Sequence, residues 1–248
     1  VMRIAVAGGT GVVGSHVVDA LRAEGNDAVV LSRRTGVDLT AGAGLDAALD
    51  GVDAVIDTAN VTTVSAGVAT RFFEAATGNL VAAAARARVA HVVLLSIVGI
   101  DRIPHDYLAG KLAQERVVET GTVPWTILRA TQFHEFAGQV FDRAKVGPLH
   151  VAPRGRVQPV AARAGGAHPA ALGGPAPHGP AADLAGPREE RLDDMVKAYA
   201  RRTGHGGWIP SVSLPGGQMK GMRAGLGLPG PGAVLGTETF AQWLDGIG

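Results

Sequence analysis

Residues 5–18 read AVAGGTGVVGSHVV, with Gly8, Gly11 and Gly14 evenly spaced between an apolar run and a helical pattern. This strand–turn–helix context is typical of a dinucleotide-binding loop. Gly8 would permit the tight turn, Gly11 would let a pyrophosphate approach the backbone, and Gly14 would let the helix pack closely. The helix N-terminus would offer N–H groups to the phosphates. In a chain with 36 glycines, a turn without a ligand is the alternative, and the context favours the loop.

Outward from this loop, apolar runs alternate with helical patterns through the first half of the chain. Such strands, apolar throughout and separated by helices, predict a parallel sheet covered on both faces. The fold class is therefore α/β, a Rossmann doubly wound parallel sheet with a small C-terminal substrate-binding part. The expected strands are Met2–Ala7, Ala28–Ser32, Ala54–Asp57, His91–Ser96 and Trp125–Arg129, and the expected helices are Val12–Glu24, Val68–Arg86 and Tyr107–Glu119.

The second half of the chain has weaker patterns. We assign residues 1–150 to the nucleotide-binding domain and 151–248 to a C-terminal part that is not an independent domain. Strands are expected within Leu149–Val160, and helices at Glu189–Thr203 and Thr237–Leu244. Residues 161–183 are rich in Ala, Gly and Pro, so they have little to bury and should be mobile.

Composition excludes several classes of protein. The net charge is +1, and the basic residues do not cluster as they do in nucleic-acid-binding proteins. The chain has no cysteine, which excludes disulfides and thiolate metal sites and favours an intracellular, cytoplasmic protein. No uninterrupted apolar stretch reaches the roughly 18 residues of a membrane helix. We expect a small-molecule substrate, no nucleic-acid or membrane partner, and a monomer or homodimer.

The end of the second strand indicates which nicotinamide cofactor fits. A carboxylate there would hold the adenosine ribose and repel a 2′-phosphate, but this chain has Ser32, Arg33 and Arg34. A hydroxyl and two guanidinium groups suit a phosphate, so NADP(H) is predicted over NAD(H). An ordinary solvated arginine pair is the alternative. Asp38 and Leu39 are candidate contacts of the adenine, although Asp38 could equally be a simple loop acid.

A serine, a tyrosine and a lysine form the candidate catalytic group. Tyr107 and Lys111 are neighbours on one helix face, an offset that chance gives in roughly three per cent of such chains. Ser96 ends a strand, at the sheet edge where ligands bind. Tyr107 would exchange a proton with the substrate, and Lys111 would lower the phenol pKa and reach the nicotinamide ribose. Ser96 would orient a carbonyl oxygen. A half-buried Tyr107 beside an exposed Lys111 is the structural alternative.

The motifs GGTGVVG, LLSIVG, YLAGK and WTILRATQFHEF resemble those of the short-chain dehydrogenase/reductase superfamily, in particular its atypical NmrA-like branch. The resemblance covers about residues 2–160 and resumes at DLAGPREERLDDMVKAYARRTG. It implies a Rossmann fold, bound NADP(H), a tyrosine acid/base at Tyr107, a lysine at Lys111 and a serine at Ser96. It also implies cofactor contacts from the diphosphate loop and from the loop after Ala54–Asp57. These residues are Gly8, Thr10, Gly11, Val12, Val13, Gly14, Thr58, Ala59 and Asn60.

The chain departs from the resemblance in one segment. Such proteins have an amphipathic helix after VQPVAAR, where this chain has AGGAHPAALGGPAPHG with Pro169 at a core-facing position. Because proline inside a helix costs about 3 kcal/mol or more, the segment should be disordered or the reported sequence should be wrong there.

Further residues are weaker candidates. Gln132, Phe133 and Phe136 follow a strand and would line the substrate cleft, although both phenylalanines are as readily core residues. His134 is more readily a satisfied polar residue than a catalyst. Trp208 and Met219 would close the pocket. The eight histidines show no HExxH pattern, and His168 and His178 lack ligand partners, so no metal is predicted.

Three functions remain open from the sequence. The leading one is an NADPH-dependent oxidoreductase that transfers hydride to a carbonyl or an activated double bond of a small organic molecule. A non-catalytic NADP(H)-binding regulator is the second, since many atypical members lack a working triad. A sugar-nucleotide epimerase-like enzyme is the third, disfavoured because such enzymes usually keep NAD and an acidic residue after the second strand. A Tyr107 hydroxyl far from the Gly8–Gly14 turn would exclude catalysis.

Overall fold

The computed structural model describes residues 1–147, 149–174, 177 and 179–247. The chain divides into two compact units whose segments interleave. The first contains Val1–Ile97, Asp106–Arg129 and Arg163–Ala182, and the second contains Val98–His105, Ala130–Ala162 and Asp183–Gly248. The predicted single boundary at residue 150 therefore does not describe these units, because the chain passes between them several times.

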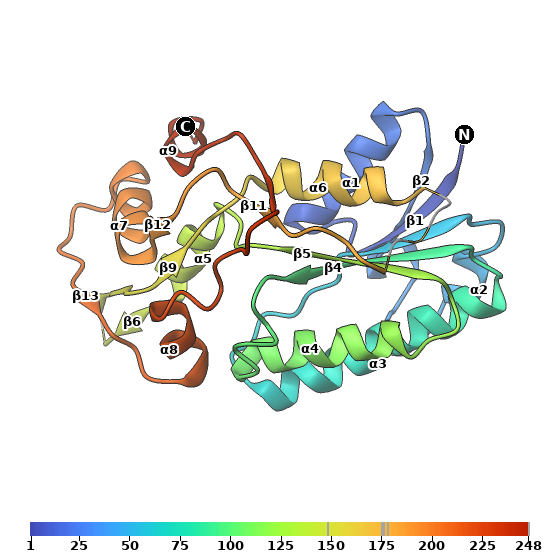
Figure 1. Cartoon of the computed structure of the whole chain (residues 1–248), viewed down its shortest axis with the longest axis horizontal. Helices are drawn as coiled ribbons and strands as arrows, with labels where there is room; N and C mark the ends of the chain where they lie inside the picture. Colours follow the sequence, from blue (N-terminus) through green and yellow to red (C-terminus); the bar gives the residue numbers. More distant parts are fainter. Residues whose placement is uncertain (148, 175–176, 178, 248) are drawn as a thin grey trace. The chain divides into compact units, whose positions relative to one another are not determined.

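A parallel sheet forms the centre of the first unit (Figure 1). Its strands run in the order β5-β4-β3-β1-β2, with β10 beside β5. The first strand is paired on both sides, Val6 lying opposite Val30 on β2 and opposite Ile56 on β3. The strand bounds are β1 Arg3–Ala7, β2 Asp27–Leu31, β3 Ala54–Asp57, β4 His91–Ile97, β5 Trp125–Ala130 and β10 Gly179–Pro180.

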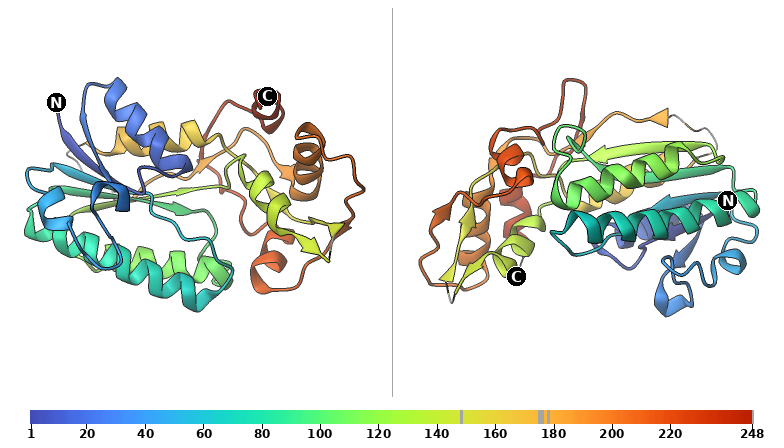
Figure 2. Two further views of the ribbon diagram at one scale, coloured as in Figure 1. Left: turned by 180° about the vertical axis from the view of Figure 1, so that it is seen from behind. Right: turned by 90° about the horizontal axis from the view of Figure 1, so that it is seen from below.

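Helices cover both faces of this sheet, as predicted. On one face lie α1 (Val12–Ala23) and α6 (Ala162–Leu172), and on the other lie α3 (Ala66–Arg86) and α4 (Asp106–Glu119) (Figure 1). Figure 2 shows α3 and α4 side by side along most of their length. Alternate residues of β1 pack into opposite cores, Ile4 and Val6 on one side, Ala5 and Ala7 on the other. The expected Rossmann α/β fold is thus confirmed.

The α6 helix corrects the prediction of a mobile segment. An alanine side chain at Gly166 would approach the His16 backbone carbonyl carbon to 2.6 Å and the Val17 nitrogen to 2.8 Å, so glycine allows close packing of α6 on α1. Ala170 joins the core that contains β1 and α1. Pro169 lies inside the helix at a buried position, although it lacks an N–H donor. Residues 175, 176 and 178 of the predicted mobile run lie outside the described residues.

The remaining elements of the first unit are the 3-10 turn η1 (Arg33–Thr35) and the short helix α2 (Leu45–Ala48), which follow β2. Their loop is pinned to α3, because Asn79 Nδ2 donates to the carbonyls of Leu39 at 3.0 Å and Thr40 at 2.9 Å.

The second unit has its own apolar core, built around α7. The buried side chains of Leu192, Met195 and Val196 on α7 pack with Val157 and Phe240. Its helices are α5 Phe136–Arg143, α7 Leu192–Arg202, α8 Gly217–Arg223 and α9 Phe240–Asp245. Its strands are β6 Lys145–Val146, β7 Leu149–His150, β8 Ala152–Pro153, β9 Arg156–Val157, β11 Leu184–Ala185, β12 Glu190–Arg191, β13 Ser211–Val212 and β14 Val234–Leu235.

Candidate functional site

The glycine turn connects β1 to α1. Gly8 has a φ of +73°, and a Cβ on it would lie 2.8 Å from the Thr58 carbonyl carbon. The Gly11 N–H closes the turn by donating to the Gly8 carbonyl at 2.8 Å. Gly11 is the N-cap of α1, and no side chain in the described part of the chain caps that helix N-terminus. The first N–H groups of α1 are therefore suited to an anion, as a diphosphate requires.

Gly14 is required for a different close contact. A Cβ here would overlap the Gly8 carbonyl oxygen and lie 2.7 Å from Thr58 Oγ1. The close packing predicted for this glycine is therefore present, but against the turn and the Thr58 loop. A Cβ on Gly11 would meet only the Gly8 carbonyl oxygen, at 3.2 Å. The pyrophosphate contacts of Gly11 and of the exposed Thr10 and Val12 stay predictions, as does that of Val13.

The end of β2 presents two exposed arginines, Arg33 and Arg34, in the η1 turn. Ser32 is engaged locally, because its N–H donates to Thr35 Oγ1 at 3.0 Å and its hydroxyl lies 3.3 Å from the same oxygen. The guanidinium groups are thus better placed than the Ser32 hydroxyl to meet a phosphate in solvent.

Asp38 and Leu39 have structural roles that the sequence did not distinguish from adenine binding. Asp38 Oδ1 accepts hydrogen bonds from Thr40 Oγ1 at 2.7 Å and from the N–H of Thr40 at 2.9 Å and of Ala41 at 3.1 Å. The bond from the Thr40 hydroxyl is the main cause that lowers the pKa of Asp38. Leu39 packs against the core that contains β1 and α3. Their contact with adenine stays a prediction.

The loop after β3 links the glycine turn to Tyr107. Thr58 binds the end of β1 twice, its N–H and its hydroxyl donating to the Ala7 carbonyl at 2.9 and 2.7 Å. The Ala59 N–H donates to Asp57 Oδ1 at 2.9 Å. Asn60 then accepts the Tyr107 hydroxyl at Oδ1, at 2.7 Å. Tyr107 therefore lies at the same edge of the sheet as the glycine turn, as a catalytic role requires.

Tyr107 is the second residue of α4, and its ring packs edge-on against Phe73 with 5.9 Å between centroids. The preceding Asp106 has a φ of +53°, in the left-handed region that favours glycine. Burial raises the pKa of Tyr107 above its ordinary value of 10.0. The prediction that a neighbouring ammonium lowers this pKa is wrong for this structure, because burial is the effect that acts on the phenol.

The position of the Lys111 side chain explains why it does not lower the pKa of Tyr107. Its side chain is 4% exposed, and Nζ donates to the Leu95 carbonyl at 2.9 Å and to Gln114 Oε1. The ammonium lies 4.9 Å from the centre of the Phe73 ring, a cation–π contact. Burial lowers the pKa of Lys111 to about 8, partly offset by the negative charges of Asp57 and Glu115. Lys111 is therefore hydrogen-bonded within the core, and the alternative of an exposed lysine is also wrong.

Three residues that the sequence patterns did not single out complete this buried network. Gln114 Nε2 donates to Asp57 Oδ2 at 3.1 Å and to Thr77 Oγ1 at 2.9 Å. The Thr77 hydroxyl donates to the same Asp57 oxygen at 2.8 Å. The available signal was a polar residue at a core-facing helical position: Gln114 follows Lys111 by one turn on α4, and Thr77 interrupts an alanine-rich face of α3.

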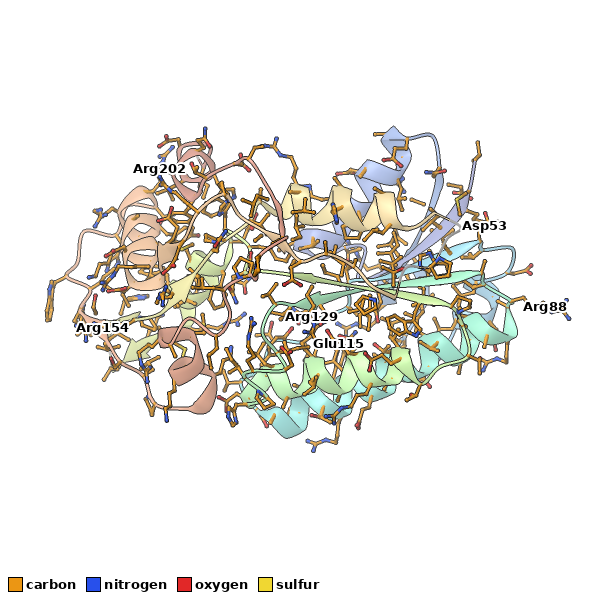
Figure 3. All side chains as sticks on the ribbon, in the orientation of Figure 1. Asp53, Arg88, Glu115, Arg129, Arg154 and Arg202 are labelled. Atoms are coloured by element: carbon orange, nitrogen blue, oxygen red, sulfur yellow. The ribbon has the colours of Figure 1, made fainter. Side chains whose placement is uncertain are left out.

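Ser96 is 2% exposed at the end of β4, beside Leu95, whose carbonyl accepts the Lys111 ammonium. No described residue supplies a hydrogen-bond partner to its Oγ. A buried hydroxyl with an unused donor is one that a ligand oxygen could satisfy. Glu115 on α4 and Arg129 on β5 point toward one another and form two hydrogen bonds of 2.9 and 2.7 Å (Figure 3).

The predicted substrate residues lie in the second unit. Phe136 packs against its apolar core, as the structural alternative proposed, and Met219, predicted to close the pocket, packs against the same core. Gln132 Oε1 is buried without a hydrogen-bond partner among the described residues. Phe133 forms a parallel bridge with Val160. Substrate contacts of Gln132, Phe133 and Phe136 stay predictions.

The other two candidates in this unit, His134 and Trp208, differ in their burial. His134 is buried, with Nε2 3.2 Å from the Glu238 carbonyl oxygen, and burial lowers its pKa. Trp208 is 76% exposed.

Among the described residues no group of three or more His, Asp or Glu side chains could hold a metal ion, and His178 lies outside them. In the same residues, no helix is both long enough and apolar enough to cross a membrane.

A parallel sheet with a glycine turn between β1 and an uncapped α1 defines a dinucleotide-binding protein of the Rossmann type. A family model described as NAD(P)H-binding matches residues 8–158. The chain therefore belongs to this NAD(P)H-binding family. No curated protein matches the sequence.

Solved structures share the fold at low sequence identity. An NADPH-dependent quinone oxidoreductase from Escherichia coli, complexed with NADPH, has a TM-score of 0.67 at 18% identity, covering 98% of this chain and 99% of that one. A short-chain dehydrogenase/reductase superfamily protein from Agrobacterium tumefaciens with bound NAD scores 0.67 at 19% identity, with 98% and 95% coverage. A nucleoside-diphosphate-sugar epimerase from Staphylococcus aureus scores 0.70 at 15% identity, with 98% and 99% coverage. The fold of the predicted superfamily is thus confirmed.

Proposed function

We propose that the protein is an NADPH-dependent oxidoreductase that reduces a carbonyl or an activated double bond of a small organic molecule, with Tyr107 as proton donor. The observation that carries the proposal is the bond from the Tyr107 hydroxyl to Asn60. Asn60 follows Thr58, whose backbone lies against Gly8 of the glycine turn. The phenol is therefore held next to the loop of a family that binds NAD(P)H.

The residues present fit the cofactor. The free N–H groups at the start of α1 would bind the diphosphate, and Arg33 and Arg34 would bind the 2′-phosphate. When bound, the nicotinamide supplies the hydride. Tyr107 Oη supplies the proton, so that a C=O group becomes CH–OH and the phenolate recovers its proton from solvent. Ser96 Oγ would donate to the same substrate oxygen. The fold shared with the E. coli quinone oxidoreductase is consistent with this chemistry.

A second function is favoured by one observation. The Lys111 ammonium bonds to Leu95 and Gln114 instead of the phenol, so the usual activation of the tyrosine is missing. A non-catalytic NADP(H)-binding regulator of the NmrA type would need no such activation.

One pair of measurements separates these functions. NADPH and NADH binding are measured by calorimetry, and NADPH oxidation is followed with a panel of quinones, aldehydes and ketones. The oxidoreductase requires tighter binding of NADPH than NADH, turnover of at least one compound, and loss of at least about 100-fold in kcat in Tyr107→Phe. Tyr199→Phe is the matched control, since Tyr199 packs in the core of the second unit.

Other results of these measurements would support a different function or exclude Tyr107 from catalysis. NADPH binding without turnover on any compound supports the regulator. Interconversion of UDP-sugars with retained NAD supports an epimerase. An unchanged rate in Tyr107→Phe removes this residue from the mechanism.

A further inference from the structure

We propose that Asn60 is the positioning residue of Tyr107, holding its hydroxyl in the protonated, proton-donating form, so that the site is built for reduction rather than for oxidation or epimerisation. This inference rests on the proposed function and deepens it. It assigns control of the phenol's protonation to an exposed loop amide instead of Lys111, and with the opposite effect on the phenol pKa.

The hydrogen bond between Tyr107 and Asn60 has a fixed direction. Tyr107 Oη donates to Asn60 Oδ1 at 2.7 Å. The same Oδ1 accepts the N–H of Val61 at 2.8 Å. A backbone N–H can only donate, so this second bond fixes Oδ1, and not the NH₂ group, toward the phenol. Asn60 therefore acts as an acceptor, and an acceptor stabilises the protonated phenol over the phenolate.

The loop that carries Asn60 is rigid. The loop is bonded to β1 through Thr58 and to the carboxylate of Asp57 through the N–H of Ala59. Asp57 is 1% exposed, and its other oxygen accepts from Thr77 and Gln114. The amide is thus held from β1, α3 and α4 together.

The Lys111 ammonium has its hydrogen-bond partners away from the phenol. An ammonium beside the phenol would favour the phenolate, the form needed to remove a proton from an alcohol. Here the Lys111 ammonium donates to the Leu95 carbonyl and to Gln114 Oε1 inside the core. The charged groups that act on Lys111 are Asp57 and Glu115. The partner that the phenol does have, Asn60, favours the acid.

The experiment reads the Tyr107 phenol directly. The chain has two tyrosines, so Tyr199→Phe leaves Tyr107 alone. Biosynthetic labelling with 3,5-difluorotyrosine, a more acidic phenol, brings its ionisation into an accessible pH range, and the fluorine resonance reports the pKa. This protein is compared with the same background carrying Asn60→Ala or Asn60→Asp. Val64→Ala, an 83% exposed position of the same loop, is the control.

Asn60→Ala should lower the phenol pKa by about 0.5 to 1, because one net hydrogen bond to the protonated form is lost. Asn60→Asp should raise it, since a carboxylate accepts more strongly and repels the phenolate. Val64→Ala should leave it unchanged. An unchanged pKa in Asn60→Ala, or a lowered one in Asn60→Asp, overturns the proposal.

Turnover provides the second readout. With a quinone or aldehyde that the protein reduces, Asn60→Ala should lower kcat with little change in KM and move the alkaline fall of the rate to lower pH. An unmoved pH profile would contradict the proposal. Absence of all turnover would refute the oxidoreductase, while the fluorine titration would still report whether Asn60 holds the phenol.

Discussion

The packing of α4 on α3 predicts opposite effects for two similar substitutions. Gly110 lies on α4 between Tyr107 and Lys111, and an alanine Cβ there would lie 2.5 Å from Ala69 Cβ and 2.7 Å from its carbonyl carbon. Gly78 lies inside α3, and an alanine Cβ there would meet no atom within 4 Å. Both glycines are in helix interiors, where alanine is favoured by about 1 kcal/mol.

Helix propensity and packing both contribute to the change in the free energy of unfolding. At Gly78 only the helix propensity changes, so Gly78→Ala should stabilise the protein by about 0.5–1 kcal/mol. At Gly110 the methyl group meets backbone that cannot rotate away, and such overpacking costs about 1–3 kcal/mol. Taking the upper half of that range, Gly110→Ala should destabilise by about 1–2 kcal/mol net. In a chain of this size, 1 kcal/mol moves Tm by about 2–4 °C.

Calorimetric melts of the two variants test this. Gly78→Ala should melt above the wild type and Gly110→Ala below it, with the two Tm values about 3–12 °C apart. Equal stabilisation by both substitutions would refute the close approach of α4 to α3 at Ala69. Because Gly110 shares its helix with Tyr107, the same refutation would remove the support that α3 gives to the placement of the phenol.

Three further predictions follow from exposed, buried and basic residues. Arg88 is exposed with a φ of +56° at the end of α3, so Arg88→Gly should raise the free energy of unfolding by about 1 kcal/mol in urea titrations, whereas Arg88→Ala should not. Burial lowers the pKa of Lys111 from 10.5 to about 8. Above pH 8 the folded state therefore loses a proton that the unfolded state still binds, so the free energy of unfolding should rise with pH. Above pH 10 the raised pKa of Tyr107 opposes this rise, because the unfolded state then loses the phenol proton first. Lys111→Met should flatten that rise in denaturation curves at pH 8 and 10; a rise that persists would contradict the burial. Arg33→Ala with Arg34→Ala should weaken NADPH binding about 10- to 100-fold, and an equal loss for NADH in calorimetry would argue against a 2′-phosphate site.

The local part of the site is predictable from the sequence because it depends on short-range backbone geometry. A turn that needs φ above zero at Gly8, followed at once by a helix, is specified within a few residues, and the apolar strands on either side predict the parallel sheet. The offset of Tyr107 and Lys111 likewise places them on one face of α4.

Residues far apart in the chain decided the rest. The direction of the Lys111 side chain depends on Gln114, Asp57 and Phe73, which come from α4, β3 and α3, and helical spacing says nothing about which neighbours a long side chain meets. The helix at 162–172 packs closely on α1 because Gly166 leaves room for the backbone at His16 and Val17, a complementarity that composition cannot express. The partner of the Tyr107 hydroxyl was equally hidden, because Asn60 reaches it only when the fold brings the loop after β3 to the start of α4.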